Sequence, residues 1–235
     1  MIITMEVPGL AFAGESNVGI DAESLAKMVS HISAVAKSDI HLLVTVGFQN
    51  FQALVQHAEL RTERYIFDAT ANLMAQVNAV VLYAELEKRG FQPKLLSERD
   101  VQTSEISEVY TPALATRYLA HEQIVLCNAA VDEGGLFDED LSAVTRALDV
   151  AATALCKAVP AGSLAHLNPA AHGPVLINSQ DLVVGTSVLP FSGAAAALCR
   201  THRLPVVLFD PRSTISVGDA LMQGVQAPDL VAVLR

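Results

Sequence analysis

The sequence predicts an α/β fold in which a mainly parallel sheet carries helices on both faces. Short aliphatic runs alternate along the chain with longer segments whose apolar residues recur at helical spacing. Of the 235 residues, 51% are hydrophobic and only 17% are charged, so the chain can bury a large core. We find no repeat, low-complexity tract or linker, which favours a single domain over residues 1–235.

The N-terminal half shows strong local signals. Asp21 can cap a helix, Gly47 breaks an aliphatic run typical of a strand buried on both faces, and Gly90 is a normal helix end. The expected elements are a strand at Ile2–Val7, a helix at Ala22–Lys37, a strand at Ile40–Val46, a second helix through His57 and a long helix at Phe67–Arg89. The last is apolar on nearly all sides, which predicts a central position or burial in a subunit interface.

The C-terminal half continues the alternation. The expected elements are a strand at Gln123–Cys127, a helix at Asp138–Val150, strands at Thr153–Ala158 and Pro174–Asn178, a helix at Gly193–His202, a strand at Leu204–Asp210, a short helix at Asp219–Gln223 and an apolar run at Leu230–Leu234. The irregular stretch Val159–Gly173, rich in Pro, Gly and His, is a candidate boundary between two lobes.

Charge and cysteine usage exclude several classes of function. The net charge of −10 and the pI near 5.0 argue against binding to nucleic acid or to anionic membranes. Cys127, Cys156 and Cys199 are far apart in apolar runs, as expected for buried, reduced thiols in a cytoplasmic protein. The N-terminus is interpreted as a strand and not as a signal peptide, and no apolar run approaches a membrane span of about 20 residues.

Three stretches together resemble bacterial uridylate (UMP) kinase, a member of the amino-acid kinase superfamily. Gly14–Asp21 (GESNVGID) is similar to the family's G-x-x-G-x-G-I-D lead into its first helix. Asp68–Gly90 is similar to its long helix, with an Asp near the start and Asn78 in the middle. Ala196–Asp210 (AALCRTHRLPVVLFD) is close to its S-L-C-R-x-N-x-L-P-I-x-V-F pattern.

The resemblance implies a three-layer αβα sandwich with a mainly parallel sheet, of the amino-acid kinase or carbamate kinase-like type. It places an acceptor lobe over about residues 1–150 and a nucleotide lobe, with the ATP site, over about residues 151–235. Members of this family typically assemble as hexamers, and the apolar helix at Phe67–Arg89 is a candidate for part of that interface. Mg-ATP is the cofactor that an active member uses.

Several phosphate-handling positions depart from the family's pattern. The family's K-x-S-G pattern aligns its Lys with Glu6 and its Gly with Gly9; a shifted count puts Met5 at the Lys. A carboxylate about 4 Å from a phosphate charge costs roughly 4 kcal/mol at an effective dielectric of about 20. The family's G-G-G-N loop reads Gly47-Phe48-Gln49-Asn50, and we expect the two added side chains to obstruct the close approach of backbone to phosphate.

The acceptor loop and the ATP-side segment are changed as well. Val131–Asp140 replaces the family's G-T-G-N-P-F-F-T-T-D with an acidic stretch, and only Asp140 and the Phe137 position match well. Lys157-Ala158 remains of K-A-T-K-V-D-G-V-Y, without the second Lys, the Asp and the Tyr. By resemblance, Asp68, Asp140 and Lys157 are candidate ligand-binding residues, and no competent catalytic set is expected.

The residues also offer weaker candidates. Arg212 follows a strand's carboxyl end, where α/β proteins tend to bind ligands, and is a candidate for contact with an anion. Asp132 and Glu133 in the acidic stretch, and His166 and His172 in the irregular stretch, are weak metal candidates because they lack ligand spacing. Acids at a helix start more commonly serve as capping residues, and exposed loop histidines are commonly solvated.

Two functions remain open. The first is a kinase-like protein without phosphoryl transfer (a pseudokinase) that acts as an oligomeric binding, storage or regulatory subunit. It would assemble as a hexamer or pair with an intact paralogue, and metal-oxyanion storage is known elsewhere in the superfamily. The alternative is an active kinase that transfers the ATP γ-phosphate to UMP or another small acceptor.

Overall fold

A computed structural model describes residues 1–15, 17–38, 40–51, 64–98, 106–121, 124–129, 138–159, 174–177, 191–214, 217–218 and 221. The strands are β1 (Ile2–Val7), β2 (His41–Val46), β3 (Lys94–Ser97), β4 (Ser107–Val109), β5 (Ile124–Asn128), β6 (Ala154–Ala158), β7 (Val175–Ile177) and β8 (Val206–Phe209). The α-helices are α1 (Ala22–Lys37), α3 (Arg64–Lys88), α4 (Pro112–Leu119), α5 (Glu139–Asp149) and α7 (Gly193–His202), with 3-10 turns η1 (Gly9–Ala11) and η2 (Gln49–Phe51).

The strands form one eight-stranded sheet in the order β4-β3-β5-β2-β1-β6-β8-β7. Neighbours pair in parallel except for β7, which runs antiparallel to β8. Strands β2 to β5 lie on one side of β1, and β6 to β8 lie on the other. The order of strands therefore reverses between the neighbours β1 and β6. The expected α/β class with a mainly parallel sheet is confirmed.

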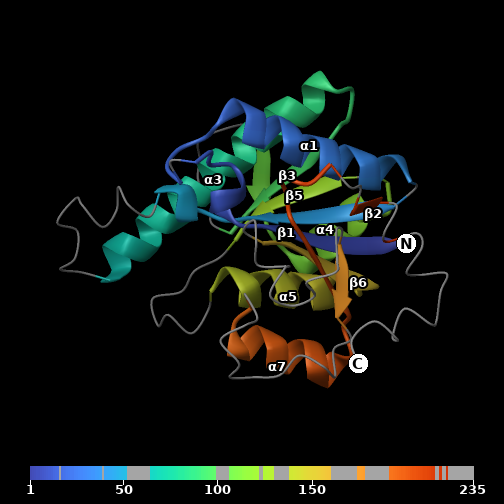
Figure 1. Ribbon diagram of the computed structural model, residues 1–235. Coiled ribbons are helices and arrows are strands. Elements are labelled where there is room, and N and C mark those ends of the chain that lie inside the picture. The colour runs from blue at the N-terminus through green and yellow to red at the C-terminus, as the bar shows by residue number, and fades with distance from the viewer. Residues whose placement is uncertain are drawn as a thin grey trace.

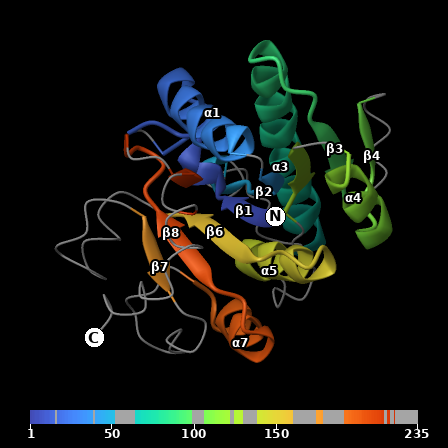
Figure 2. The same ribbon diagram turned by 90° about the vertical axis from the view of Figure 1, so that its right-hand side faces the viewer.

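Helices cover both faces of the sheet (Figures 1 and 2). Val44 and Leu126 point to the face covered by α1 and α3, where they join the largest hydrophobic cluster. Their strand neighbours Leu43 and Val125 point the other way, toward α4. On that second face α5 and α7 pack together over β6 and β8. The alternation of strand residues thus builds the three-layer αβα sandwich that the resemblance implied.

Most expected elements appear within one or two residues of their predicted bounds. Helix α1 starts after Asp21, whose side chain accepts a hydrogen bond from Ser24 N, and α7 has the expected bounds. Helix α3 begins earlier than predicted. The helix predicted through His57 begins instead with the 3-10 turn η2, and residues 52–63 lie outside the described residues. The Asp219–Gln223 helix (except Leu221), the Leu230–Leu234 run and residues 160–173 also lie outside them.

Three elements were not predicted: β3, β4 and α4. The two strands are short, with four and three residues, so they give little periodic signal. Helix α4 did carry a local signal, because Thr111 caps it by accepting a hydrogen bond from Leu114 N and Pro112 occupies the first turn. Capping residues can therefore reveal a short helix whose hydrophobic pattern is weak.

Helix α3 is buried on one side only. Ala71, Ala75 and Ala79 are fully buried, whereas Leu73 and Val77 are 50% and 46% exposed. The alternative that α3 is a central helix is therefore wrong for the isolated chain, and its outer face remains open.

The cysteines and the helices agree with two further expectations. All three cysteines are free and buried, as predicted. None of the helices in the described part of the chain has both the length and the apolar composition that a bilayer crossing needs.

Candidate functional site

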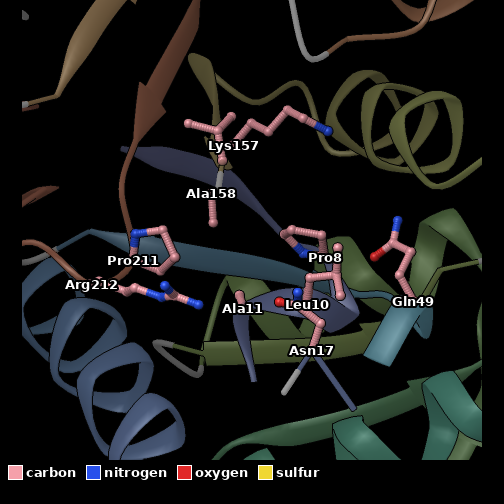
Figure 3. Close-up of a pocket in the computed structure, with 10 residues that line it drawn as sticks. Pro8, Leu10, Ala11, Asn17, Gln49, Lys157, Ala158, Pro211 and Arg212 are labelled. Carbon is pink, nitrogen blue, oxygen red and sulfur yellow. The ribbon is translucent and has the colours of Figure 1, made fainter. Parts of the chain in front are cut away.

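The carboxyl ends of β1, β2, β6 and β8 surround a cavity of about 380 Å³, which we call the strand-edge cavity (Figure 3). Its described lining comprises Pro8, Leu10, Ala11, Asn17, Gln49, Lys157, Ala158, Val159, Pro211 and Arg212. Ligands of open α/β sheets bind beside the strand ends where the order of strands reverses, as it does between β1 and β6 here. The cavity is therefore the candidate functional site.

A buried charge cluster, the Glu6–Lys157–Asp140 triad, lies next to this cavity. Glu6 and Lys157 are direct partners in the register of β1 and β6, and Lys157 Nζ lies 2.7 Å from Glu6 Oε1. Lys157 also forms an ion pair with Asp140, in the first turn of α5. Glu6 and Lys157 are only 1% and 7% exposed. The Lys157 side chain extends from β6 toward α5 (Figure 3).

The protonation of the triad follows from burial and mutual attraction. Burial raises the pKa of Glu6 well above its ordinary value, although the Lys157 ammonium opposes this. Burial alone would lower the pKa of Lys157, but the carboxylates of Glu6 and Asp140 outweigh it and raise that pKa. Lys157 thus remains a cation whose charge is already matched by two carboxyl groups.

The loop after β2 holds a carboxylate of the same chain. Phe48 N donates a hydrogen bond of 2.8 Å to Glu139 Oε1. A Cβ at Gly47 would lie 2.2 Å from Glu139 Oε2, so glycine there leaves room for the Glu139 side chain. Burial raises the pKa of Glu139 to about 7, against the lowering effect of the bond from Phe48. Glu139 occupies the place of an anion on this loop.

The loop after β1 is filled in a similar way. Gly9 N donates a hydrogen bond of 2.7 Å to Gln49 Oε1. A Cβ at Gly9 would lie 2.3 Å from Gln49 N and 2.5 Å from Phe48 C, so the two loops touch through backbone. The amides of Gly9 and Phe48, the type of donor that can cradle a phosphate, both carry side-chain oxygens of this chain.

The two side chains that the loop after β2 carries in place of glycines, Phe48 and Gln49, have different surroundings. None of residues 47–50 adopts a positive φ, which agrees with the two added side chains. The Phe48 ring, however, packs edge-on against Phe67 of α3, with ring centroids 5.9 Å apart. Gln49 and Glu139 are therefore the residues whose side chains occupy the amides of these loops, and sequence reasoning missed Glu139 because its contact spans 91 positions.

Asn50 and Asn78 fix the same loop to α3. Their amides exchange two hydrogen bonds, of 3.0 and 2.8 Å. Asn78 Nδ2 also donates to the Gly47 carbonyl, and Asn50 Nδ2 to the Gly19 carbonyl. The Asn noted within the long helix thus has a structural role, as an anchor of the loop after β2.

The remaining candidate residues lie in different parts of the fold. Asp68 is buried in α3, at 1% exposure. Asp138 caps α5 through Leu141 N, and Asp140 accepts from Ser192 N at the start of α7. The weak metal candidates Asp132, Glu133, His166 and His172 lie outside the described residues. Within the described ranges, no group of three or more His, Cys, Asp or Glu residues is placed to hold a metal ion.

Arg212 is the candidate that faces the strand-edge cavity. Its guanidinium is directed toward Ala11 (Figure 3), and its backbone N donates to Asp210 Oδ1 at 2.8 Å. The side chain is exposed and forms no ion pair with another residue in the described part of the chain. Arg212 can therefore meet an anionic ligand.

Comparisons with known proteins give a consistent result. No family model matches the chain. The uridylate kinase of Rhodopseudomonas palustris (strain BisA53) is 28% identical over 235 residues, covering 98% of this chain and 96% of that protein. The crystal structure of UMP kinase from Bacillus anthracis superposes with a TM-score of 0.73 at 17% identity, over 95% of this chain and 91% of that one.

A second solved structure agrees with the first. UMP kinase from Ureaplasma parvum gives a TM-score of 0.72 at 14% identity and covers 94% of this chain and 95% of that one. The similarity seen in the motifs therefore extends over nearly the whole length of both chains.

Proposed function

We propose that this uridylate-kinase-like chain, which has the fold of the UMP kinases, has lost phosphoryl transfer and acts as an oligomeric binding or regulatory subunit. One observation carries the proposal: Lys157, the lysine aligned with the ATP-side motif, is buried between the carboxyl groups of Glu6 and Asp140. Phosphoryl transfer depends on positioned cations and amides that compensate the charge of the transferred group. Here Lys157 and the amides of Gly9 and Phe48 are already satisfied within the chain.

The positions of the other Lys and Arg residues support the same conclusion. The sequence contains no Lys or Arg between Lys157 and Arg200, so that whole segment can bring no permanent cation to a triphosphate. Arg200 and Arg203 lie at the C-terminal end of α7, just before the start of β8. They are thus near the amino end of β8, whereas the cavity lies at the carboxyl ends of the strands. Among the described residues of the C-terminal lobe, Arg212 is the one unpaired cation that lines the cavity.

The ligand that fits this cavity has modest charge. Most lining residues are apolar or proline, and Arg212 provides a single exposed cation. A small ligand with one anionic group and an apolar body matches such walls better than a nucleoside triphosphate does. Storage of a metal oxyanion remains a second use of the scaffold, and elemental analysis of the purified protein tests it.

The proposal predicts that purified protein forms no ADP from Mg-ATP, with or without UMP, above a blank in which a mock purification replaces the protein. The physical reason is the loss of several charge-compensating groups, each of which typically contributes about a hundredfold or more to rate. A coupled assay measures ADP release. ADP formation that is absent from the mock preparation and is abolished in Arg212→Gln would support the alternative, an active kinase of UMP or another small acceptor.

We also propose that a second copy of this chain covers the open face of α3. Leu73 and Val77, with Val80 and Ala84, follow the 4-3-4 spacing of a helix–helix seam, and Leu73 and Val77 are about half exposed. The seam can meet its own copy across a two-fold axis. It would be one contact of a hexamer or of a mixed oligomer with a paralogue.

Val77→Asp is expected to shift the protein to a smaller assembly, because a carboxylate in an apolar seam must be desolvated without a partner. Light scattering coupled to size exclusion measures the mass. Val109→Asp is the matched control, since Val109 is similarly exposed, at 43%, but lies on the edge strand β4. An unchanged mass for Val77→Asp, or an equal change in both variants, would reject this interface.

Two further assignments remain proposals. We place the protein in the cytoplasm, which its three free, buried thiols support. We also keep the division into an acceptor lobe, about residues 1–150, and a nucleotide-type lobe, about residues 151–235. The triad joins these lobes, because Glu6 and Asp140 belong to the first and Lys157 to the second.

A further inference from the structure

A second hollow, of about 460 Å³, lies between α1, the end of α3 and the loop after β8. We call it the α1 hollow. The residues on which its chemistry depends are Lys27, Ser30, Arg89, Arg212, Ser213 and Thr214. They come from three segments that are far apart in the sequence, and all of them carry hydrogen-bond donors. Arg212 lines both this hollow and the strand-edge cavity.

Arg89 is held in place by neutral partners. Its Nη1 donates to Ser30 Oγ at 3.0 Å and its Nη2 to the Ala26 carbonyl at 3.2 Å. These contacts fix the guanidinium over α1 without neutralising its charge. Arg89 therefore presents a positioned cation, of the kind that recognises phosphate and carboxylate groups.

The loop that carries Arg212 is also fixed to α1. His31 of α1 is buried, hydrogen-bonds to the backbone of Ser213 and Pro211, and lies against the Phe209 ring at a centroid distance of 5.5 Å. Ser213 N donates to the Asp210 carbonyl, which closes a turn. The opposite wall of the hollow is thus built on the core and not on a free loop.

The charge of the hollow opposes that of the whole chain. Lys27, Arg89 and Arg212 line it, and Glu23 is the one carboxylate among its described lining residues, in a protein of net charge −10. Lys27 pairs with Glu23 at 2.7 Å, but the two side chains are 42% and 76% exposed, so this pair is weak and can rearrange. Asp210 lies behind the loop, beside His31.

We propose that the α1 hollow binds a compact, multiply charged oxyanion, such as a phosphate or dicarboxylate group of a metabolite, between Arg89 and Lys27 on one side and Arg212 on the other. This site adjoins the strand-edge cavity, with which it shares Arg212, and does not depend on the loss of kinase activity. Because Arg212 lines both spaces, an anion in the hollow competes with the cavity for the same guanidinium.

The test is calorimetric titration with pyrophosphate at constant ionic strength, with malonate in a second arm. Saturable binding is expected, and it should weaken by about tenfold or more in Arg89→Gln, because the variant loses a charge-assisted hydrogen bond to the anion. Arg212→Gln should weaken it similarly. Arg117→Gln is the matched control, since it removes one exposed cation on α4, which lies on the other face of the sheet.

Each outcome bears on the proposal. Binding of pyrophosphate alone identifies a phosphate site, whereas equal binding of malonate identifies a general oxyanion site. Absence of saturable binding, or equal weakening in Arg89→Gln and Arg117→Gln, overturns the proposal. Melting temperatures of the variants show whether each one is folded. Any ATP isotherm that disappears in Arg89→Gln arises from this hollow, so it does not contradict the proposed loss of phosphoryl transfer.

Discussion

Lys157→Met is expected to lower the free energy of unfolding at pH 7 by about 3–5 kcal/mol, as typically happens when one partner of a buried ion pair is removed. The substitution leaves the buried carboxyl group of Glu6 and the partly buried one of Asp140 without the cation that holds them. Urea denaturation followed by circular dichroism measures the change. The loss should shrink at lower pH, because protonated carboxyl groups need no cation.

Two companion variants make this prediction sharp. Lys157→Met/Glu6→Gln should recover part of the lost stability, because one of the buried charges is removed with the lysine. Lys88→Met is the surface control: Lys88 also contacts a glutamate, but its side chain is 69% exposed, and a change within about 0.5 kcal/mol is expected. A loss for Lys157→Met as small as that of Lys88→Met would show that the triad is not a buried structural cluster.

The fold was largely predictable because its signals are local. Asp21 before α1, the aliphatic run of β2 and the acids before α5 each act within a few residues of the element that they define. Strands β3 and β4 escaped because three or four residues carry too little pattern. What local signals could not give was the register of the sheet, which places Glu6 directly opposite Lys157 across 151 positions.

That register changes the interpretation of Glu6. Glu6 aligns with the lysine of the family's K-x-S-G pattern, and its carboxylate was therefore expected to repel a phosphate. The structure instead turns its carboxyl group to Lys157, so the substituted residue Glu6 and the retained Lys157 form one charge cluster. In the same way, Gly47 resembled a remnant of a phosphate loop, but the space beside it holds the carboxylate of Glu139. Packing against Glu139 of the same chain explains the glycine at position 47 without a ligand.

Glu139→Gln is expected to flatten the pH dependence of stability and to make the protein more stable than the wild type above pH 7. Burial raises the pKa of Glu139 to about 7 from its ordinary value of 4.5, which we take for the unfolded chain. Between these values the folded protein keeps a proton that the unfolded chain releases, so stability falls as the pH rises from about 4.5 to about 7. The total change is about 3 kcal/mol for a shift of this size.

The glutamine variant isolates the charge from the contact, because its amide oxygen can still accept the hydrogen bond from Phe48 N. Urea denaturation at several pH values between 4.5 and 8.5 measures the slope. Some slope should remain, since burial raises the pKa of Glu6 as well. Glu23→Gln, which alters a carboxylate whose side chain is 76% exposed, should leave the slope as it is in the wild type. Equal slopes in the wild type and Glu139→Gln would mean that Glu139 is not confined against the loop after β2, and that the amide of Phe48 is open to an external anion.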